Sequence, residues 1–204
     1  EIFKDEVEYR FSTLVQRFRE MAFVTRQVEI SLVDERSEPN RSMKFYFEGG
    51  IASFVQYLNR NRTVLHPVYF VENELDKVGI EVAVQYTDSY SESIYSFANT
   101  INTVDGGTHL TGFRSAITRV LNDYARKNGL IKDNDPNFTG DDTREGMTAI
   151  VSVKHPDPQF ESQTKVKLMN TEVQTLVQQA VGEGFSEFLE ENPSVGKALL
   201  KKCL

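Results

Sequence analysis

The sequence predicts an α+β fold in which strands and helices are partly segregated along the chain. Alternation of apolar and polar residues, typical of strands, is concentrated at 68–97 and 147–153. Apolar residues at helical spacing instead fill 109–128 and 171–189. Of the 204 residues, 39% are hydrophobic and 26% are charged, so the chain can form the core of one domain, or of one domain with a piece of another.

The first 45 residues predict a helix followed by a β-hairpin. Apolar residues recur at helical spacing over 10–22 and then alternate over 28–32. A charged, proline-containing turn at 34–42 leads to a return strand at 43–47. One helix and two strands are too few to form a core, so this unit is expected to pack against something else.

The middle of the chain predicts a second helix and several strands. Glu48-Gly49-Gly50 precedes one helical face, which consists of Ile51, Phe54, Val55 and Leu58. A strand is expected at 68–71. The clean alternation at 80–86 predicts a strand with one face open to water, and 94–97 is expected to return as an antiparallel hairpin or meander.

The second half predicts two long helices separated by a loop and a strand. A helix follows Asp105-Gly106-Gly107-Thr108-His109 and is ended by Gly129. Residues 132–142 are polar and predict an exposed loop, and 147–153 alternate as a strand. Thr171 and Gln174 have the spacing of a capping box at the start of a long amphipathic helix. Asn192-Pro193 is typical of the start of a short final helix.

Composition excludes some classes of function. The net charge of −7 and the pI near 5.1 argue against a surface that is basic throughout, although a local basic face remains compatible with them. The single cysteine, Cys203, can form neither an internal disulfide nor a zinc site, which favours a reducing, cytoplasmic setting. No apolar run has the length of a membrane span, and no signal peptide is visible. The absence of an initiator methionine suggests an excised fragment.

The segment 155–165 is the most informative candidate site. It carries two prolines and joins a predicted strand to a predicted helix, with Gln163-Thr164-Lys165 at its end. A lysine on such a loop can be an ordinary solvated side chain, which is the more frequent case. It can also contact a phosphate, because a charge-assisted hydrogen bond contributes roughly 1.5–3 kcal/mol. Composition and spacing leave both interpretations open.

Three further segments have a functional and a structural interpretation. The glycines of 105–109 could cradle an anion at a helix start, but a structural turn with close backbone packing is favoured. His109 could face a ligand, but a core or hinge histidine is favoured. Asp141, Asp142 and Glu145 suggest a metal site or acid–base chemistry, yet their spacing fits no EF-hand, so a charged turn neutralised by Arg144 is favoured. Basic residues on the 109–128 helix could face nucleic acid, although a solvated helical face is the default; they are Arg114, Arg119, Arg126 and Lys127.

Four motifs follow one another along the chain: Glu48-Gly-Gly-Ile-x-x-Phe-Val-x-Tyr-Leu58, Asp105-Gly-Gly-Thr-His109, Gly140-Asp-Asp-x-Arg-Glu-Gly146 and Pro156-Asp-Pro-x-Phe160-x-x-Gln163-Thr-Lys165. Together they closely resemble the ATPase subunits of bacterial type IIA topoisomerases, the DNA gyrase B family in particular. The resemblance covers nearly the whole chain, and the four motifs in order are specific although each alone is weak. It implies that 46–204 are a transducer domain of ribosomal protein S5 domain 2-like fold. Residues 1–45 are then the C-terminal end, the last helix and strands, of a GHKL-type ATP-binding domain.

The resemblance also implies site residues and partners. Lys165, the catalytic candidate, is similar to the family's lysine that contacts the γ-phosphate of ATP, and Gln163 is similar to its neighbour on the same phosphate. The rest of the ATP pocket and the ligands of Mg2+ would lie upstream, so this chain alone is not expected to be active. The implied partners are the upstream ATP-binding domain, the gyrase A protein, a second copy of the gyrase B protein and double-stranded DNA, with no membrane.

The implied function is coupling of ATP binding and hydrolysis to gate closure, strand passage and negative supercoiling. The equivalent domain of the topoisomerase IV ATPase subunit, which would serve decatenation, is one alternative. The uninterrupted His155-Pro-Asp-Pro-Gln-Phe160 favours gyrase over that alternative. A non-catalytic protein-interaction domain is the other alternative, motivated by the acidic surface and by the lack of a catalytic centre.

Overall fold

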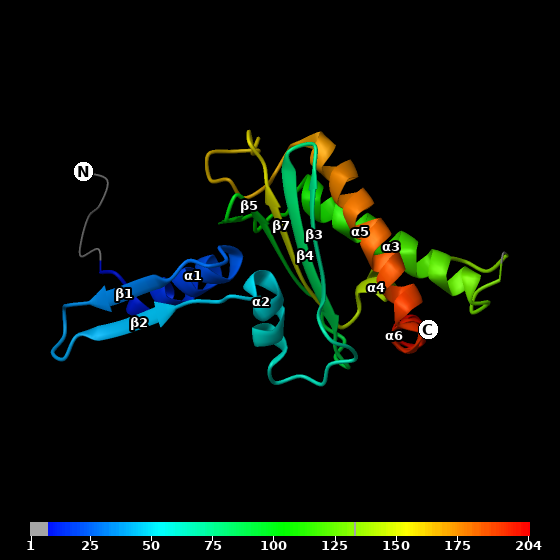
Figure 1. Ribbon diagram of the computed structural model, residues 1–204, viewed down its shortest axis with the longest axis horizontal. Helices are drawn as coiled ribbons and strands as arrows, with labels where there is room; N and C mark the ends of the chain where they lie inside the picture. Colours follow the sequence, from blue (N-terminus) through cyan, green and yellow to red (C-terminus); the bar gives the residue numbers. More distant parts are fainter. Residues whose placement is uncertain (1–7, 133) are drawn as a thin grey trace.

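The computed structural model describes residues 8–132 and 134–204 as an α+β fold with a mixed sheet. A five-stranded sheet lies in the middle, with helices α3 and α5 on one face and helix α2 on the other (Figure 1). The N-terminal helix and hairpin extend from the α2 side of the sheet (Figure 1). None of the helices in these ranges is long and apolar enough to cross a membrane.

The N-terminal residues form the helix and hairpin that the sequence predicts. Helix α1 spans Phe11–Val24, and strands β1 (Ile30–Asp34) and β2 (Arg41–Phe45) pair antiparallel. The turn between the strands is held by Asp34, a buried carboxylate that accepts hydrogen bonds from Arg36 at 2.8 Å and Arg41 at 2.7 Å. These bonds, that from Arg36 above all, hold the pKa of Asp34 far below its usual range.

The central sheet has the strand order β3-β4-β7-β5-β6. Its strands are β3 (Tyr69–Leu75), β4 (Val78–Tyr86), β5 (Ser93–Ala98), β6 (Ile101–Asn102) and β7 (Met147–Lys154). β7 pairs antiparallel with β4 and parallel with β5. The expected hairpin between 80–86 and 94–97 is therefore wrong, because β7 lies between the two strands. A strand that is apolar on both faces is most stable at the centre of a sheet, and local turn signals do not report this.

Both faces of β4 are covered, so the expected open face at 80–86 is also wrong. Val82 and Val84 contact the α3–α5 layer, while Ala83 packs on the other side with Phe54 of α2. The polar side chains on that side have partners. Gln85 accepts a hydrogen bond from Asn59 at 3.0 Å and donates one to the carbonyl of His66 at 2.9 Å. Burial of these groups is tolerated because they are hydrogen-bonded.

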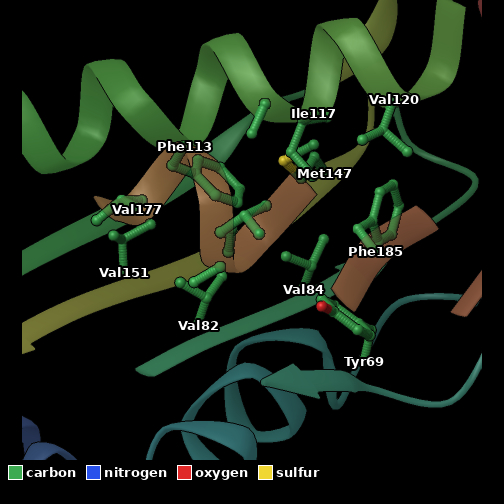
Figure 2. Packing of buried hydrophobic residues seen from close by; sticks show 14 of the residues in the cluster. Tyr69, Val82, Val84, Phe113, Ile117, Val120, Met147, Val151, Val177 and Phe185 are labelled. Atoms are coloured by element: carbon green, nitrogen blue, oxygen red, sulfur yellow. The ribbon is translucent and has the colours of Figure 1, made fainter. Parts of the chain in front are cut away.

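The main core lies between the sheet and helices α3 (Thr108–Lys127) and α5 (Thr171–Glu191). Figure 2 shows Phe113 and Ile117 of α3 directed at the sheet, where Val82 and Val151 meet them. The two helices approach closely at Gly112, where a Cβ atom would overlap the backbone of Gln174. The predicted long helices and the stop at Gly129, which has φ +68°, are confirmed.

The remaining helices are α2 (Gly50–Asn59), α4 (Gly140–Arg144) and α6 (Pro193–Cys203). The expected start of a final helix at Asn192-Pro193 is confirmed; Asn192 also donates a side-chain hydrogen bond to the Phe188 carbonyl at the end of α5. The capping box expected at Thr171 and Gln174 is wrong, because Asn170 occupies the N-cap position. A capping box exists instead at Thr139 and Asp142, where α4 begins within the loop expected at 132–142.

Candidate functional site

The candidate site is the loop 155–170, which connects β7 to α5 at one end of the sheet (Figure 1). Gln163 and Lys165 lie together at its exposed tip, as the sequence predicts for a loop. Their side chains point into solvent and do not contribute to the core. Any function of these two residues therefore depends on a group that approaches from outside this chain.

The tip is a tight and strained turn. Lys165 adopts a left-handed conformation with φ +57°, which is uncommon for a residue other than glycine. Its backbone N–H donates to the carbonyl of Ser162 at 3.0 Å, and the hydroxyls of Ser162 and Thr164 are 2.7 Å apart. The Lys165 ammonium lies 5.9 Å from the ring centre of Phe160, at the edge of a cation–π contact. Strained residues of this kind persist where the surrounding structure holds them, often at ligand sites.

The stem below the tip is a short antiparallel pair of segments. The N–H of Glu161 donates to the carbonyl of Lys167 at 3.0 Å, and the N–H of Met169 donates to that of Gln159 at 2.8 Å. Between these bonds, Phe160 forms a β-bridge with Leu168. Leu168 is buried in the main core, so the stem is anchored to the folded body although the tip is exposed.

The motif 105–109 forms a third segment beside this stem. Asp105 donates its N–H to the Val166 carbonyl at 3.0 Å, and Leu168 donates its N–H to the Gly106 carbonyl at 3.1 Å. Thr108, the first residue of α3, donates to the Leu168 carbonyl at 3.1 Å. This confirms close backbone packing as the function of the glycines. The Leu168 carbonyl accepts from the first N–H group of α3, and Gly107 occupies the N-cap position.

The base of the loop is fixed by amide side chains. Asn99 pairs with the backbone of His155, donating to its carbonyl at 2.8 Å and accepting from its N–H at 2.7 Å. The Asn170 side chain accepts from the N–H of Gln159 at 2.6 Å and donates to Glu172 at 2.9 Å. The bond from Asn170 is the main reason that the pKa of Glu172 lies below its usual range.

A histidine completes the base. The Nδ1 atom of His155 accepts a hydrogen bond from the N–H of Asp157 at 3.0 Å. Its Nε2 atom, 3.1 Å from Glu172, therefore carries the proton and donates it. Sequence reasoning did not identify Asn99, His155 and Asn170 as supports of the loop. The available signal was the Asn-Thr pair at 99–100, since asparagine tolerates the left-handed conformation that Asn99 adopts at φ +46°.

His109 lies in the core beneath this site, as expected. It is fully buried, and its Nε2 atom lies 3.1 Å from the hydroxyl of Thr103. Its Nδ1 atom is buried with no hydrogen-bond partner among the described residues. Burial lowers the pKa of His109 to about 4, so the ring is neutral at physiological pH.

The acidic segment 140–146 forms a charged turn that includes the short helix α4. Arg144 bonds Glu92 at 3.1 Å and Asp141 at 2.9 Å, which confirms the expected neutralisation. Thr139 caps α4 with Asp142 as its capping-box partner, and the hydrogen bonds that Asp142 accepts from Thr139 lower the pKa of Asp142. Across residues 8–132 and 134–204, no cluster of three or more His, Cys, Asp or Glu side chains could hold a metal ion.

Most of the basic residues named on α3 bind other parts of the chain. Arg114 bonds Glu92 at 2.7 Å, and Lys127 bonds Glu190 of α5 at 2.6 Å. Arg126 donates to the Lys132 carbonyl at 2.6 Å and the Asp135 carbonyl at 3.0 Å. Arg119 lies at Gly182 in an open groove between α3 and α5. The structure therefore gives Arg114, Arg126 and Lys127 partners within the chain.

Solved structures define the class of protein. The chain resembles the 43K ATPase domain of Thermus thermophilus gyrase B, determined in complex with an aminocoumarin, with a TM-score of 0.83 and 39% identity over 97% of this chain and 53% of that one. A topoisomerase IV ATP-binding domain of Francisella tularensis shares the fold alone, with a TM-score of 0.81 and 23% identity over 98% of this chain and 53% of that one. The fold is that of about half of the ATPase region found in gyrase B and topoisomerase IV proteins.

The sequence comparisons identify the family within this class. The family model DNA gyrase B matches residues 50–204. The DNA gyrase B protein of Clostridium acetobutylicum is 53% identical over 207 residues, which cover 100% of this chain and 32% of that protein. The chain belongs to the DNA gyrase B family, and it spans about a third of the length of that relative. The resemblance drawn from the four motifs is confirmed.

Proposed function

We propose that residues 46–204 are the transducer domain of a gyrase B protein, with a ribosomal protein S5 domain 2-like fold. Residues 1–45 are the C-terminal end of the preceding ATP-binding domain. Lys165 and Gln163 contact the γ-phosphate of ATP held in that upstream domain. The main support is the position of Lys165, which is exposed and has a positive φ at the tip of the loop. The stem of this loop is hydrogen-bonded to the start of α3.

The chemistry of the tip suits an anionic ligand. The Lys165 ammonium is exposed and has only a long contact with Phe160, so it can leave this ring for a phosphate oxygen at little cost. A charged hydrogen bond to phosphate is roughly twice as strong as a neutral one. Lys165 would act by stabilising charge during phosphoryl transfer, and Gln163 would hold an oxygen or a water beside it.

The stem can transmit the phosphate contact of Lys165 to the rest of the domain. Lys165 is connected through Leu168 to the start of α3, so a change at the tip is carried into the body of the domain. Binding and release of the γ-phosphate by Lys165 would thereby bias a rigid-body rotation between the two domains. In the intact cytoplasmic enzyme, this rotation couples ATP turnover to gate closure, DNA strand passage and negative supercoiling.

Other segments and other chains supply the remaining parts of the enzyme. ATP is the substrate, and the ligands of Mg2+ belong to the upstream ATP-binding domain. The gyrase A protein and a second copy of the gyrase B protein complete the enzyme, which acts on double-stranded DNA. Arg119, in the groove between α3 and α5, is the basic residue of α3 best placed for a local contact with DNA.

The test is ATP turnover by a protein that includes the upstream domain, with Lys165→Ala compared to wild type. We expect turnover to fall about 100-fold or more, the range for a lost electrostatic contact to the transition state, with an unchanged melting temperature. Lys77→Ala is a matched control, because Lys77 is also an exposed lysine with positive φ, at the β3–β4 turn. Normal turnover by Lys165→Ala would return Lys165 to an ordinary solvated lysine and would favour a protein-interaction domain.

A further inference from the structure

Arg26 joins the N-terminal residues to the central sheet. Its guanidinium lies 2.5 Å from the carboxylate of Glu72 on β3 and 2.7 Å from that of Glu81 on β4. Within the part of the chain that the structure describes, both ion pairs between residues 8–45 and the sheet start at Arg26. Gly50 leaves room for this side chain, because a Cβ atom at Gly50 would lie 2.6 Å from Cδ of Arg26.

The ion pair between Arg26 and Glu81 depends on the exact position of Arg26, because Glu81 is buried. Its side chain is only 5% exposed, so water does little to stabilise its charge. The carboxylate lies 2.7 Å from Arg26 and 3.3 Å from the ammonium of Lys154. A buried carboxylate is stable only when it is paired and hydrogen-bonded. The place of Arg26 relative to the sheet is therefore fixed by charge as well as by packing.

Lys154, the second cation beside Glu81, is next to the candidate loop in the chain. Lys154 is the last residue of β7, and the next residue, His155, begins the loop 155–170. The Glu81 carboxylate thus receives one cation from the N-terminal residues and one from the base of the loop that carries Lys165. Figure 1 shows the N-terminal helix and hairpin beside α2 and the loop at the end of the sheet where β7 stops.

The other contacts between residues 8–45 and the rest of the chain include an aromatic stack and one hydrogen bond from an arginine, both to α2. Phe23 of α1 stacks on Phe54 of α2 with ring centres 4.6 Å apart, and Arg19 donates to the hydroxyl of Tyr57 at 2.9 Å. Stacked rings can slide over one another with little loss of contact, whereas a charged hydrogen bond requires a defined distance and angle. The stack can act as a pivot, and the Arg26 ion pairs determine the orientation about it.

We infer that Arg26 is a positioning residue for the phosphate contact of Lys165. The inference rests on the proposed function, in which the nucleotide is held by the domain that continues into residues 8–45. Arg26 acts through Glu81 and Lys154 to place the loop relative to that nucleotide. Without Arg26, the two parts sample a wider range of orientations, and the productive position of Lys165 is populated less often.

The experiment measures ATP turnover by the protein with its upstream domain, in wild type, Arg26→Gln, Lys165→Ala and the double variant. We expect Arg26→Gln to lower kcat about tenfold, less than the roughly 100-fold that a misplacement of about 1 Å can cause, because the productive position is still populated part of the time. The double variant should be only slightly slower than Lys165→Ala, because Arg26 acts through the position of the loop and Lys165→Ala already removes the loop's charged contact with the phosphate, leaving only that of Gln163. Arg26→Lys should recover most of the loss. Arg17→Gln, which removes an ion pair inside α1, is the matched control.

The outcomes separate the inference from the proposed function. Normal turnover by Arg26→Gln, or losses that multiply in the double variant, would overturn the positioning role while leaving Lys165 as the phosphate contact. Normal turnover by Lys165→Ala would overturn both. Arg26→Gln could lose turnover because it is less stable, which a much lower melting temperature would reveal. Arg26→Lys, which keeps the charge, then distinguishes the two causes. An Arg26→Lys variant with normal stability but low turnover would contradict positioning by charge.

Discussion

The backbone of Gly107 lies directly against that of Leu168, so that the start of α3 and the stem of the candidate loop form one hydrogen-bonded unit. Gly107 has φ +135°, a conformation that other residues rarely adopt. A Cβ atom at this position would lie 2.6 Å from the nitrogen of Leu168. Two motifs that are about 60 residues apart in the sequence are thus two sides of one contact.

Gly107→Ala should therefore be strongly destabilising. The added methyl group overlaps backbone atoms, which cannot move aside as a flexible side chain can, and the φ angle adds strain. We expect a loss of about 3 kcal/mol or more in the free energy of unfolding, measured by urea titration.

Gly129→Ala serves as the control for this prediction. Gly129 also has positive φ, at +68°, but a Cβ atom there would meet nothing within 4 Å. Its replacement should cost about 1 kcal/mol, the conformational penalty alone. Equal losses for the two variants would mean that the contact with Leu168 does not stabilise the fold.

Phe23→Ala should weaken the joint between the N-terminal residues and the sheet. Phe23 is 1% exposed and stacks on Phe47 and Phe54. Removing a buried aromatic ring costs about 3–5 kcal/mol through lost burial and the cavity that remains. Thermal unfolding of the chain measures the effect. Tyr90→Ala, at a residue that is 83% exposed, should change the melting temperature little; a small effect of Phe23→Ala would show that the stack is not a stabilising contact.

His109 should make the fold sensitive to acid. Its pKa in the folded chain is about 4, against an ordinary 6.5, so the unfolded chain takes up the proton first as pH falls. Neutral His109 therefore makes its full contribution to the free energy of unfolding above pH 6.5, and this contribution is lost as pH falls from 6.5 toward 4. The difference between the two pKa values corresponds to roughly 3 kcal/mol.

The measurement for His109 is the free energy of unfolding as a function of pH, in wild type and in His109→Asn. The comparison is needed because burial also lowers the pKa of His66, which titrates in the same direction. Wild type should lose more stability than the variant between pH 6.5 and 4. Parallel curves would contradict a buried neutral histidine.

Local patterns in the sequence predicted the elements that carry the site. The helical spacing over 109–128 and 171–189 and the alternation over 147–153 correspond to α3, α5 and β7. The loop between β7 and α5 followed from them, with Gln163 and Lys165 at its end. These features depend on neighbours within a few residues, and periodicity reports such neighbours directly.

Tertiary structure alone decided which segments meet. β7 lies between β4 and β5, where both of its faces are buried. The alternation of residues within one strand does not show which strands lie beside it. The contact of Gly107 with Leu168 and that of Arg26 with Glu81 each join residues more than 50 positions apart. The sequence by itself determined the elements, the family motifs and the exposed lysine; the packing of distant segments determined how that lysine is held, because burial and charge pairing depend on the whole core.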